Sequence, residues 1–362
     1  MTAIAVPPEH DVPLAALTTL GIGGPASGFW IARTPDDVKS ACDWCERHQA
    51  SLFVLGGGSN LLIADAGVQG VVLRMAIEGR EFVADADDTL VRAGAGEHWD
   101  AVVAAIVARG LAGLECLSGI PGTVGGTPIQ NVGAYGQEVS DTIDTVDAFD
   151  RRAGRLVSLS VDECGFAYRN SRFKHEEPGR FIVCAVTFRL RPGTASVKYP
   201  DVQAALTSAG IEEPTLADVR NVVLAIRRRK GMVVDASDPD SRSVGSFFMN
   251  PVVGAAKRDD VARRESATVP GYPMAGDQVK IPAAWLIERS GFGRGYADGS
   301  VAISSKHPLA LVNRGGATAR DVLRLAAAIK RRVLDRFDIA LIPEPVFVGL
   351  SDDPDAKFLQ DV

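Results

Sequence analysis

The chain has 362 residues, of which 46% are apolar and 23% are charged, and its formal net charge at pH 7 is −6. A chain of this length exceeds a single simple core, so two or three domains are expected. The net negative charge argues against a broad nucleic-acid surface, and no apolar run is long enough to span a membrane.

Short strands and helices alternate over the first 150 residues. The N-terminal stretch MTAIAVPPEHDVP has no apolar signal core, so the sequence predicts a cytoplasmic protein. The apolar patterns that follow predict four strands and two helices. The strands are expected near 29–32, 52–55, 71–73 and 90–93, and the helices at about 35–49 and 97–109.

Residues 144–191 are richer in strand patterns. TVDAFD and RLVSLS flank a turn, and RFIVCAVTFRL reads as an apolar strand. The polar, proline-bearing connection between 191 and 213 indicates a domain boundary. A helix from about 216 to 230 opens the C-terminal unit, which ends with a helix over 319–337 and a strand over 339–349.

Cys42 and Cys45 form a C-x-x-C motif inside the first predicted helix. A redox motif of this kind usually opens a helix after a strand, and a zinc site needs two more ligands, which His48 alone does not supply. We therefore interpret both thiols as structural and expect no metal site. The remaining cysteines are expected to be core residues: Cys116, Cys164 and Cys184.

Two glycine-rich turns carry most of the functional information. The first, LFVLGGGSNLLIAD, joins two apolar strands through Gly56–Gly58. The second, SGIPGTVGGTPIQNVGAYGQEVSD, holds six glycines, with Gln130 and Asn131 as the strong hydrogen-bonding side chains at its centre. Bare backbone amides in such turns form anion-binding nests. The pair therefore indicates a cradle for a large phosphate-bearing cofactor, although a glycine-rich turn between core strands remains an alternative.

Two common nucleotide motifs are absent. Neither turn is a P-loop, because no Gly-Lys-Ser/Thr follows it. A strand does meet a helix at Gly94 and Gly96, but the third glycine position of a dinucleotide fingerprint holds Trp99, which cannot allow close helix–strand packing. This segment is therefore not interpreted as a Rossmann motif.

Five motifs in order resemble the UDP-N-acetylenolpyruvoylglucosamine reductase (MurB) family. They are LGGGSNLL, GIPGTVGGTPIQNVGAYGQE, AYRNSRFK, GSFFMNP and PEPVF, and the match runs from TTLGIGGPA at 18–26 to 348. The resemblance implies an α+β fold with a two-lobed FAD-binding domain of the vanillyl-alcohol oxidase/p-cresol methylhydroxylase type over 1–213, its lobes at about 1–75 and 76–213. It also implies an α+β substrate domain over 214–344, with the tail 345–362 returning to the first lobe.

The implied reaction is reduction of the enolpyruvyl group of UDP-N-acetylglucosamine-enolpyruvate to the lactyl ether of UDP-N-acetylmuramate, in peptidoglycan precursor synthesis. It needs a hydride, which flavin and no side chain can supply, a proton donor, and a group that stabilises charge on the substrate carboxylate. The resemblance implies Ser246 as proton donor, with Arg169 and Glu344 stabilising the enolate. From the residues alone, Ser246 could be a turn serine, Arg169 a surface residue and Glu344 a solvent-facing edge residue.

The resemblance also implies the residues that bind the ligands. FAD contacts are expected from Leu55, Gly56, Gly57, Gly58, Ser59, Asn60, Leu61, Gly119, Ile120, Pro121, Gly122, Val124, Gly125, Gly126, Gln130, Asn131, Gly133, Ile182 and Val183. Substrate contacts are expected from Tyr135, Tyr199, Lys230, Asn250 and His307. Tyr199 indicates the form of the family in which a tyrosine loop covers the substrate. NADPH is expected to bind in the same pocket as the UDP-sugar, in alternation with it.

Two other functions share parts of this pattern. A vanillyl-alcohol-oxidase-type flavoprotein would have the glycine turns but no reason to contain GSFFMNP and PEPVF at these positions. A nucleotide-sugar sensor would keep the fold without the chemistry, which the presence of Ser246, Arg169 and Glu344 argues against. The expected protein binds no nucleic acid, metal or membrane, and is expected to be a monomer.

Overall fold

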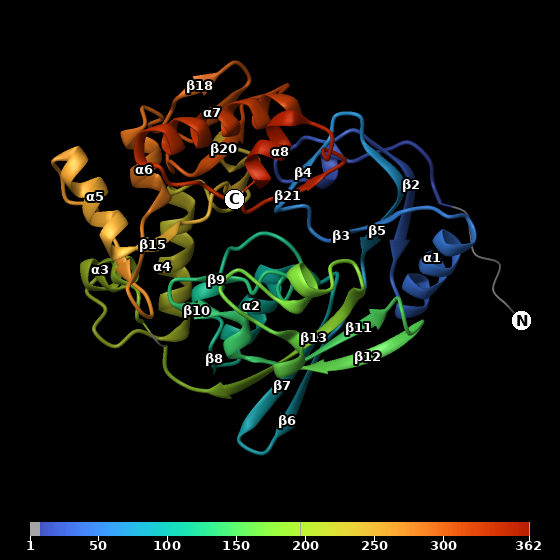
Figure 1. Cartoon of the computed structure of the whole chain (residues 1–362). Coiled ribbons are helices and arrows are strands. Elements are labelled where there is room, and N and C mark those ends of the chain that lie inside the picture. Colours follow the sequence, from blue (N-terminus) through green and yellow to red (C-terminus); the bar gives the residue numbers. More distant parts are fainter. Residues whose placement is uncertain (1–7, 196, 362) are drawn as a thin grey trace, which may run out of the picture. The chain divides into compact units, whose positions relative to one another are not determined.

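The computed structural model describes residues 8–195 and 197–361 and divides into two compact units, whose elements are labelled in Figure 1. The first unit comprises the described residues up to Val12 together with Ala26–Gly58 and Gln69–Val233. The second comprises Pro13–Pro25, Ser59–Val68 and the described residues from Val234 onward. Residues 1–7, part of the stretch in which the sequence has no signal core, lie outside the described residues.

The first unit contains a four-stranded sheet with the order β1-β2-β5-β3. Its strands are β1 (Val12–Pro13), β2 (Pro25–Ala32), β3 (Leu52–Leu55) and β5 (Val68–Met75). Strand β3 runs parallel to β5, with Leu52 opposite Val71. Helix α1 (Pro35–Arg47) begins at a capping box in which Thr34 and Asp37 each bind the other's backbone N–H. These elements agree with the strands and the helix predicted for this part of the chain.

A larger antiparallel sheet with the order β12-β11-β13-β7-β6 forms the core of the first unit, and β8 pairs with the end of β13. Its strands are β6 (Arg80–Asp85), β7 (Asp88–Gly94), β8 (Leu111–Ala112), β11 (Ile143–Asp150), β12 (Arg155–Ser160) and β13 (Phe181–Pro192). The first six residues of β13 are all buried, so both faces of this strand are covered. Trp99, at the start of α2 (Trp99–Val107), packs its ring 5.8 Å from that of Phe188.

The connection expected over 191–213 contains a helix. Helix α3 (Pro200–Ser208) packs against α4 (Leu216–Arg229) through Val202, Leu206 and Val223. This shared apolar cluster belongs to the first unit, which therefore extends to Val233. The division of the chain thus differs from the boundary expected at residue 213.

Short elements complete the first unit. Strands β9 (Gly133–Ala134) and β10 (Gln137–Glu138) pair with each other. A single π-helical turn, η6, covers Arg172–Glu176. The short 3₁₀ helices are η2 (Glu115–Leu117), η3 (Val124–Gly126), η4 (Val139–Asp141) and η5 (Asp162–Cys164).

The second unit has three small sheets, with the orders β14-β20-β19-β18, β15-β17-β16 and β21-β4. The strands are β4 (Leu61–Ile63), β14 (Ser243–Ser246), β15 (Val252–Gly254), β16 (Tyr272–Pro273), β17 (Gln278–Lys280), β18 (Ala297–Asp298), β19 (Val301–Ile303), β20 (Ala310–Asn313) and β21 (Val346–Val348). The helices are α5 (Ala255–Glu265), α6 (Ala283–Arg289), α7 (Ala319–Phe337) and α8 (Pro354–Gln360), with 3₁₀ turns η1 (Ala15–Leu17) and η7 (Pro239–Ser241).

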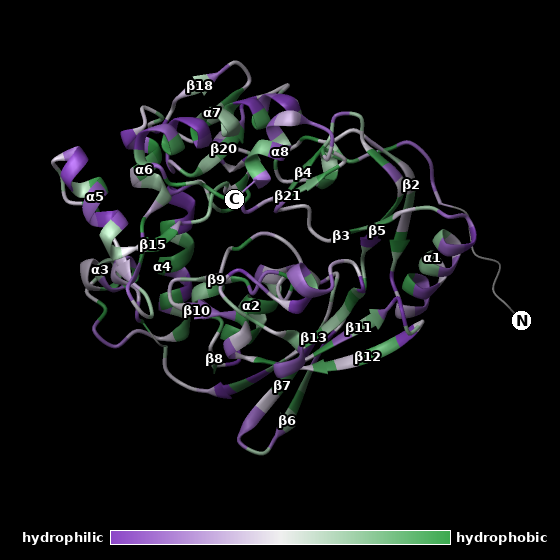
Figure 2. Cartoon of the chain, viewed as in Figure 1, coloured by the Kyte–Doolittle hydropathy of each residue, from purple (hydrophilic) through white to green (hydrophobic). Residues whose placement is uncertain are grey.

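Helix α7 organises the core of the second unit, and it has the bounds that the sequence predicts. Its buried face includes Val322, Ile329 and Val333, and hydrophobic and hydrophilic segments alternate along it in Figure 2. The carboxylate of Asp65 accepts the N–H of Ala319 at 2.8 Å, which ties the segment after β4 to the start of this helix.

The predicted C-terminal strand is shorter than expected. Only Val346–Val348 of the predicted 339–349 forms a strand, because Pro343 and Pro345 interrupt the pattern of backbone donors. This strand pairs in parallel with β4, Val346 opposite Leu61. The pairing and the Asp65 contact explain why the segment 59–68 belongs to the second unit.

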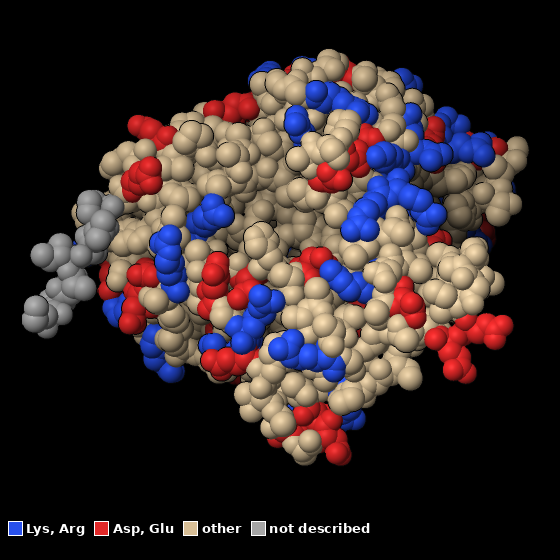
Figure 3. Space-filling view, turned by 180° about the vertical axis from the view of Figure 1, so that it is seen from behind, with Lys and Arg blue, Asp and Glu red and all other residues tan. Residues whose placement is uncertain are grey.

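Charge and cysteine placement agree with the sequence patterns. On the face shown in Figure 3, basic and acidic side chains are interspersed. Among the described residues, no helix is both long and apolar enough to cross a membrane. Cys42 and Cys45 lie within α1, as the sequence predicts, and burial raises the pKa of Cys42 to about 11, which disfavours the reactive thiolate. The other three cysteines are buried, as expected.

Candidate functional site

The two glycine-rich turns touch in the first unit. A β-carbon on Gly57 would lie 2.6 Å from the α-carbon of Gly122, which is closer than real contacts allow. Gly58 (φ 63°) and Gly122 (φ 117°) also adopt the left-handed backbone region that other residues rarely enter. Glycine is therefore required here both by the close approach of the backbones and by their conformation.

Unused hydrogen-bond donors gather where the turns meet. In the described part of the chain, the N–H groups of Gly57, Gly58 and Gly122 donate to no other backbone group. The hydroxyl of Thr123 is buried and has no hydrogen-bond partner, and a β-carbon on Gly56 would lie 3.0 Å from it. An array of free backbone N–H groups beside a free hydroxyl suits a phosphate. The residues present therefore fit a diphosphate-bearing cofactor. We call this meeting point of the two turns, formed by Gly56–Gly58, Gly122 and Thr123, the glycine cradle.

Other amides of the second turn are already used within the protein. Gly119 N–H donates to the carboxylate of Asp100 at 2.6 Å, and Gly125 N–H donates to the carbonyl of Ala95 at 2.9 Å. Asp100 is itself held by both terminal nitrogens of Arg220, at 2.7 and 2.8 Å. Burial acts to raise the pKa of Asp100, but the hydrogen bonds from Arg220 and Gly119 outweigh it and lower that pKa. This pair anchors the start of the second turn to α4.

The side chain of Asn131 fastens the second turn to its surroundings. Its amide nitrogen donates to Glu138 at 2.9 Å and to the carbonyl of Ala167 at 3.2 Å, and its oxygen accepts the N–H of Ser140. The residue is fully buried. Its amide is therefore occupied by internal bonds that fix the turn.

Arg169 holds the end of the same turn. Its guanidinium donates to the carbonyl of Gly133 at 2.6 Å and to that of Asn131 at 3.3 Å. Arg169 (φ 53°), Asn131 (φ 46°) and Tyr135 (φ 50°) all have left-handed backbones. Such conformations are costly for residues with side chains and concentrate at functional sites. Because Arg169 binds the carbonyl of Gly133, two residues before Tyr135, both residues lie at the end of the second glycine-rich turn.

An aromatic pair lies beside this end of the turn. The rings of Tyr135 and Tyr199 meet edge to face with centroids 5.3 Å apart. Burial raises the pKa of the Tyr135 hydroxyl, while the charge of Arg227 and a hydrogen bond to it oppose the rise. Tyr199 is the residue before α3, and Lys230, just after α4, forms an ion pair with Asp201 at 3.1 Å. Three expected substrate-binding residues of the first unit, Tyr135, Tyr199 and Lys230, thus lie along the second turn and at the ends of α3 and α4.

A second group of expected site residues lies in the second unit. Glu344 N–H donates to the carbonyl of Phe247 at 2.9 Å, so Glu344 lies beside the end of β14, where Ser246 is half-buried. The Asn60 side chain donates to the Glu344 carbonyl at 3.3 Å, and Val346 N–H donates to the Asn60 carbonyl at 3.0 Å. Ser246, Glu344 and Asn60, far apart in sequence, are therefore neighbours.

Asn250 and His307 belong to the same unit but have structural bonds of their own. The Asn250 side chain accepts the N–H of Ala283 at 2.9 Å, at the start of α6. His307 Nδ1 accepts the N–H of Leu309 at 3.2 Å, which leaves the hydrogen of the neutral ring on Nε2. The turn before His307 is fixed by the buried Asp240, which accepts from the hydroxyl of Ser305 at 2.5 Å.

The expected site residues therefore divide between the two units. Ser59, Asn60 and Leu61, from the first glycine turn, belong to the second unit with Ser246, Asn250, His307 and Glu344. Several expected cofactor contacts are wholly buried apolar residues of the first unit, namely Leu55, Val124, Ile182 and Val183. Sequence reasoning missed Thr123, although it is the polar side chain between Gly122 and Val124 in the motif.

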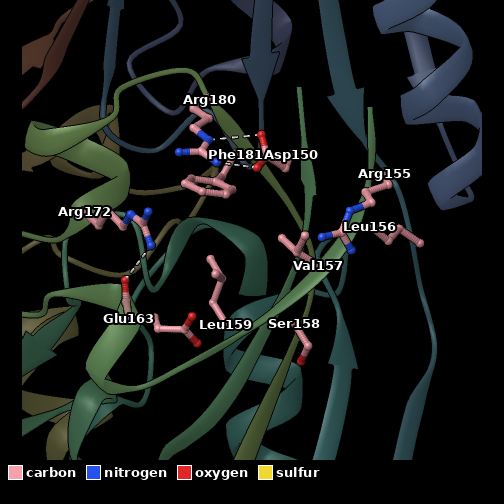
Figure 4. A pocket seen from close by; sticks show the side chains of 10 residues that line it. All are labelled: Asp150, Arg155, Leu156, Val157, Ser158, Leu159, Glu163, Arg172, Arg180 and Phe181. Atoms are coloured by element: carbon pink, nitrogen blue, oxygen red, sulfur yellow. Dashed lines mark hydrogen bonds and ion pairs between the residues drawn. The ribbon is translucent and has the colours of Figure 1, made fainter. Parts of the chain in front are cut away.

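A pocket of about 450 Å³ lies elsewhere in the first unit, and Figure 4 shows its lining. Two of its three arginines are already in ion pairs, because Arg180 pairs with Asp150 at 2.6 Å and Arg172 pairs with Glu177 at 2.7 Å. No residue expected to bind cofactor or substrate lines it. Nor do the described residues contain a cluster of three or more potential metal ligands. The glycine cradle remains the candidate site.

Comparisons with known proteins identify both parts of the chain. A family model described as an FAD binding domain matches residues 26–160, and one described as the UDP-N-acetylenolpyruvoylglucosamine reductase C-terminal domain matches residues 238–348. These matches, with the mixed strand and helix content, confirm the expected fold class.

Full-length relatives match as well. A UDP-N-acetylenolpyruvoylglucosamine reductase of Thermobifida fusca is 46% identical over 352 residues, covering 94% of this chain and 98% of the relative. One of Nocardia farcinica is 47% identical over 351 residues, covering 94% and 90%. The crystal structure of the Thermus caldophilus reductase (MurB) has a TM-score of 0.64 at 29% identity, covering 95% of this chain and 100% of that one.

Proposed function

Because the chain belongs to the UDP-N-acetylenolpyruvoylglucosamine reductase family, we propose that it reduces UDP-N-acetylglucosamine-enolpyruvate to UDP-N-acetylmuramate with NADPH as reductant. FAD, held by the glycine cradle, supplies the hydride chemistry when bound. The observation that carries this proposal is the contact of Gly57 with Gly122 beside the unpaired hydroxyl of Thr123, because it supports a diphosphate site within the FAD-binding domain.

Arg169 binds the substrate carboxylate in this proposal. A guanidinium presents N–H donors in a planar fork that matches a carboxylate. The bonds from Arg169 to the carbonyls of Gly133 and Asn131 support this role, since they fix the plane of the guanidinium. The left-handed backbone at Arg169 further supports a positioned side chain rather than a solvent-facing one.

Ser246 donates the proton, and Glu344 helps to stabilise the charge that develops on the substrate. Two observations support these roles: both residues are half-buried, and the bond from Glu344 N–H to the Phe247 carbonyl makes them neighbours. A serine hydroxyl is a weak acid, so it can protonate only a carbanion held within hydrogen-bond distance. Arg169 belongs to the first unit, whereas Ser246 and Glu344 belong to the second.

The remaining assignments concern the nucleotide-sugar. The paired rings of Tyr135 and Tyr199 contact the substrate, and Tyr199 covers the bound UDP-sugar. Lys230 binds a phosphate of the UDP group. Asn250 and His307 contribute from the second unit. NADPH uses the same pocket as the UDP-sugar in alternation. We propose that the protein works as a monomer in the cytoplasm.

An anaerobic titration of the purified protein tests the proposal. NADPH should bleach the flavin absorbance, and addition of the enolpyruvyl UDP-sugar should restore it in the absence of oxygen. A vanillyl-alcohol-oxidase-type enzyme would instead be bleached by an alcohol or sugar and recover its colour in air. A protein that binds no flavin, or whose bleached flavin ignores the enolpyruvyl UDP-sugar, would contradict the proposal.

A further inference from the structure

Thr123 is a buried polar residue without an internal partner. The residue is 8% exposed, and its hydroxyl is one of three buried polar side-chain atoms that lack a hydrogen bond in the described part of the chain. A buried hydroxyl left unpaired lowers the stability of a folded protein. Such groups are uncommon in native structures and call for an explanation.

Neighbouring hydroxyls in the same segment are all paired. Thr127 Oγ donates to the carbonyl of Val124 at 2.8 Å, and Ser118 Oγ donates to the carbonyl of Glu115 at 2.6 Å. Both are at least as buried as Thr123. The hydroxyls of Ser118 and Thr127 thus form hydrogen bonds within the chain, whereas the hydroxyl of Thr123 does not.

The local backbone explains why Thr123 is not satisfied within the chain. It precedes the short helix Val124–Gly126 with an extended backbone (φ −121°, ψ 159°), a position from which threonine usually caps a helix. No such bond forms. Instead, a β-carbon on Gly56 would lie 3.0 Å from the Thr123 hydroxyl, so this oxygen lies against the first glycine turn.

We propose that the Thr123 hydroxyl donates a hydrogen bond to a phosphate oxygen of the FAD diphosphate, alongside the free N–H groups of Gly57 and Gly122. This inference rests on FAD as the cofactor and adds a side-chain donor to a site otherwise made of backbone. The Thr123 hydroxyl and the N–H groups of Gly57 and Gly122 can all donate hydrogen bonds, which suits an anionic phosphate. A hydroxyl bound to a charged oxygen makes a stronger bond than one bound to a neutral group.

Affinity measurements with two substitutions test the assignment. Thr123→Val keeps the shape of the side chain and removes the donor, whereas Thr123→Ser keeps the donor. With FAD affinity read from flavin fluorescence, Thr123→Val should bind FAD about ten- to hundredfold more weakly, the range expected for loss of a hydrogen bond to a charged group. Thr123→Ser should remain within about threefold of the unsubstituted protein. ADP, which contains the diphosphate without the flavin, should lose affinity for Thr123→Val by a similar factor.

Thermal unfolding of the FAD-free protein gives an independent readout. Thr123→Val removes an unpaired hydroxyl, so its unfolding temperature should equal or exceed that of the unsubstituted protein. Thr127→Val, the matched control, removes a paired hydroxyl and should unfold at a lower temperature. Thr123→Val should also show a smaller rise in unfolding temperature on adding FAD.

Three results would overturn the inference. Unchanged FAD affinity in Thr123→Val would mean that the hydroxyl contacts no part of the cofactor. Weaker FAD binding with unchanged ADP binding would place it at the flavin ring rather than at the phosphates. A lower unfolding temperature for FAD-free Thr123→Val would mean that the hydroxyl already has an internal partner. Failure of the unsubstituted protein to bind FAD would instead contradict the proposed function itself.

Discussion

Gly57 and Gly122, from two turns separated by more than sixty residues, approach so closely that a β-carbon on Gly57 would lie 2.6 Å from the α-carbon of Gly122. The contact brings together two turns whose N–H groups at Gly57, Gly58 and Gly122 donate to no other backbone group among the described residues. Because the neighbouring atoms are backbone, they cannot rotate out of the way of an added side chain. The proposed cofactor site therefore depends on this contact.

Gly57→Ala should weaken FAD binding by at least about tenfold, since an added methyl group must separate the two turns and overpacking of this kind costs about 1–3 kcal/mol. FAD retained after gel filtration, measured by absorbance, checks this. Gly293→Ala is the control, because a β-carbon there meets nothing within 4 Å and its backbone is not left-handed. Equal FAD content in the two variants would contradict the role of the contact.

Ser246→Ala and Glu344→Gln should separate the two half-reactions. Flavin reduction by NADPH should proceed at nearly the unsubstituted rate, because neither residue is assigned a role in it. Reoxidation by the enolpyruvyl UDP-sugar should slow by about 10²–10⁴-fold, the range for loss of a general acid. Stopped-flow absorbance resolves the two steps. Similar slowing of both would argue against the assigned roles.

Arg169→Lys should impair the reaction even though the positive charge is kept. Lysine cannot reproduce the fork that reaches the carbonyls of Gly133 and Asn131, so the charge would no longer be held in place. We expect kcat/KM for the enolpyruvyl substrate to fall about 10²-fold or more, a loss of about 3 kcal/mol in transition-state stabilisation. Steady-state kinetics check this, and an unchanged kcat/KM would show that Arg169 does not bind the carboxylate.

Asp150 predicts a specific acid sensitivity. A hydrogen bond from Arg180 lowers the pKa of this carboxyl from 3.8 to about 2. Because the folded-state pKa lies below the unfolded one, the pair stabilises the fold above about pH 4, and the contribution is lost as the pH falls from 3.8 towards 2. Asp150→Asn should therefore lower the unfolding temperature at pH 7 and flatten its dependence on pH between 4 and 2. Asp87→Asn, at an exposed aspartate, should change neither.

Local patterns in the sequence predicted individual elements well. Helix α7 has the predicted bounds because an apolar face and a Thr318–Asp321 capping box both specify them. The prediction was less accurate where prolines interrupted a pattern, as at Pro343 and Pro345. It also missed α3, whose polar surface reads as a loop even though Pro200 favours a helix start.

Long-range pairing could not be read from the sequence. The segment 59–68 joins the second unit because β4 pairs with β21 and Asp65 binds the start of α7, and neither partner is near in the chain. For the same reason, the motif could not reveal which donors are used internally. Gly119 N–H is occupied by Asp100, whereas the Thr123 hydroxyl is unpaired, and only the folded structure distinguishes them.

The most direct test of the central claim is an NMR titration of the ¹⁵N-glycine-labelled protein with FAD and with ADP. If backbone amides of both turns bind the diphosphate, the signals of Gly57, Gly58 and Gly122 should shift with either ligand and exchange more slowly with solvent. Gly154 and Gly210, where a β-carbon would meet nothing within 4 Å, should not respond. Binding of FAD without any change at Gly57, Gly58 and Gly122 would contradict the account.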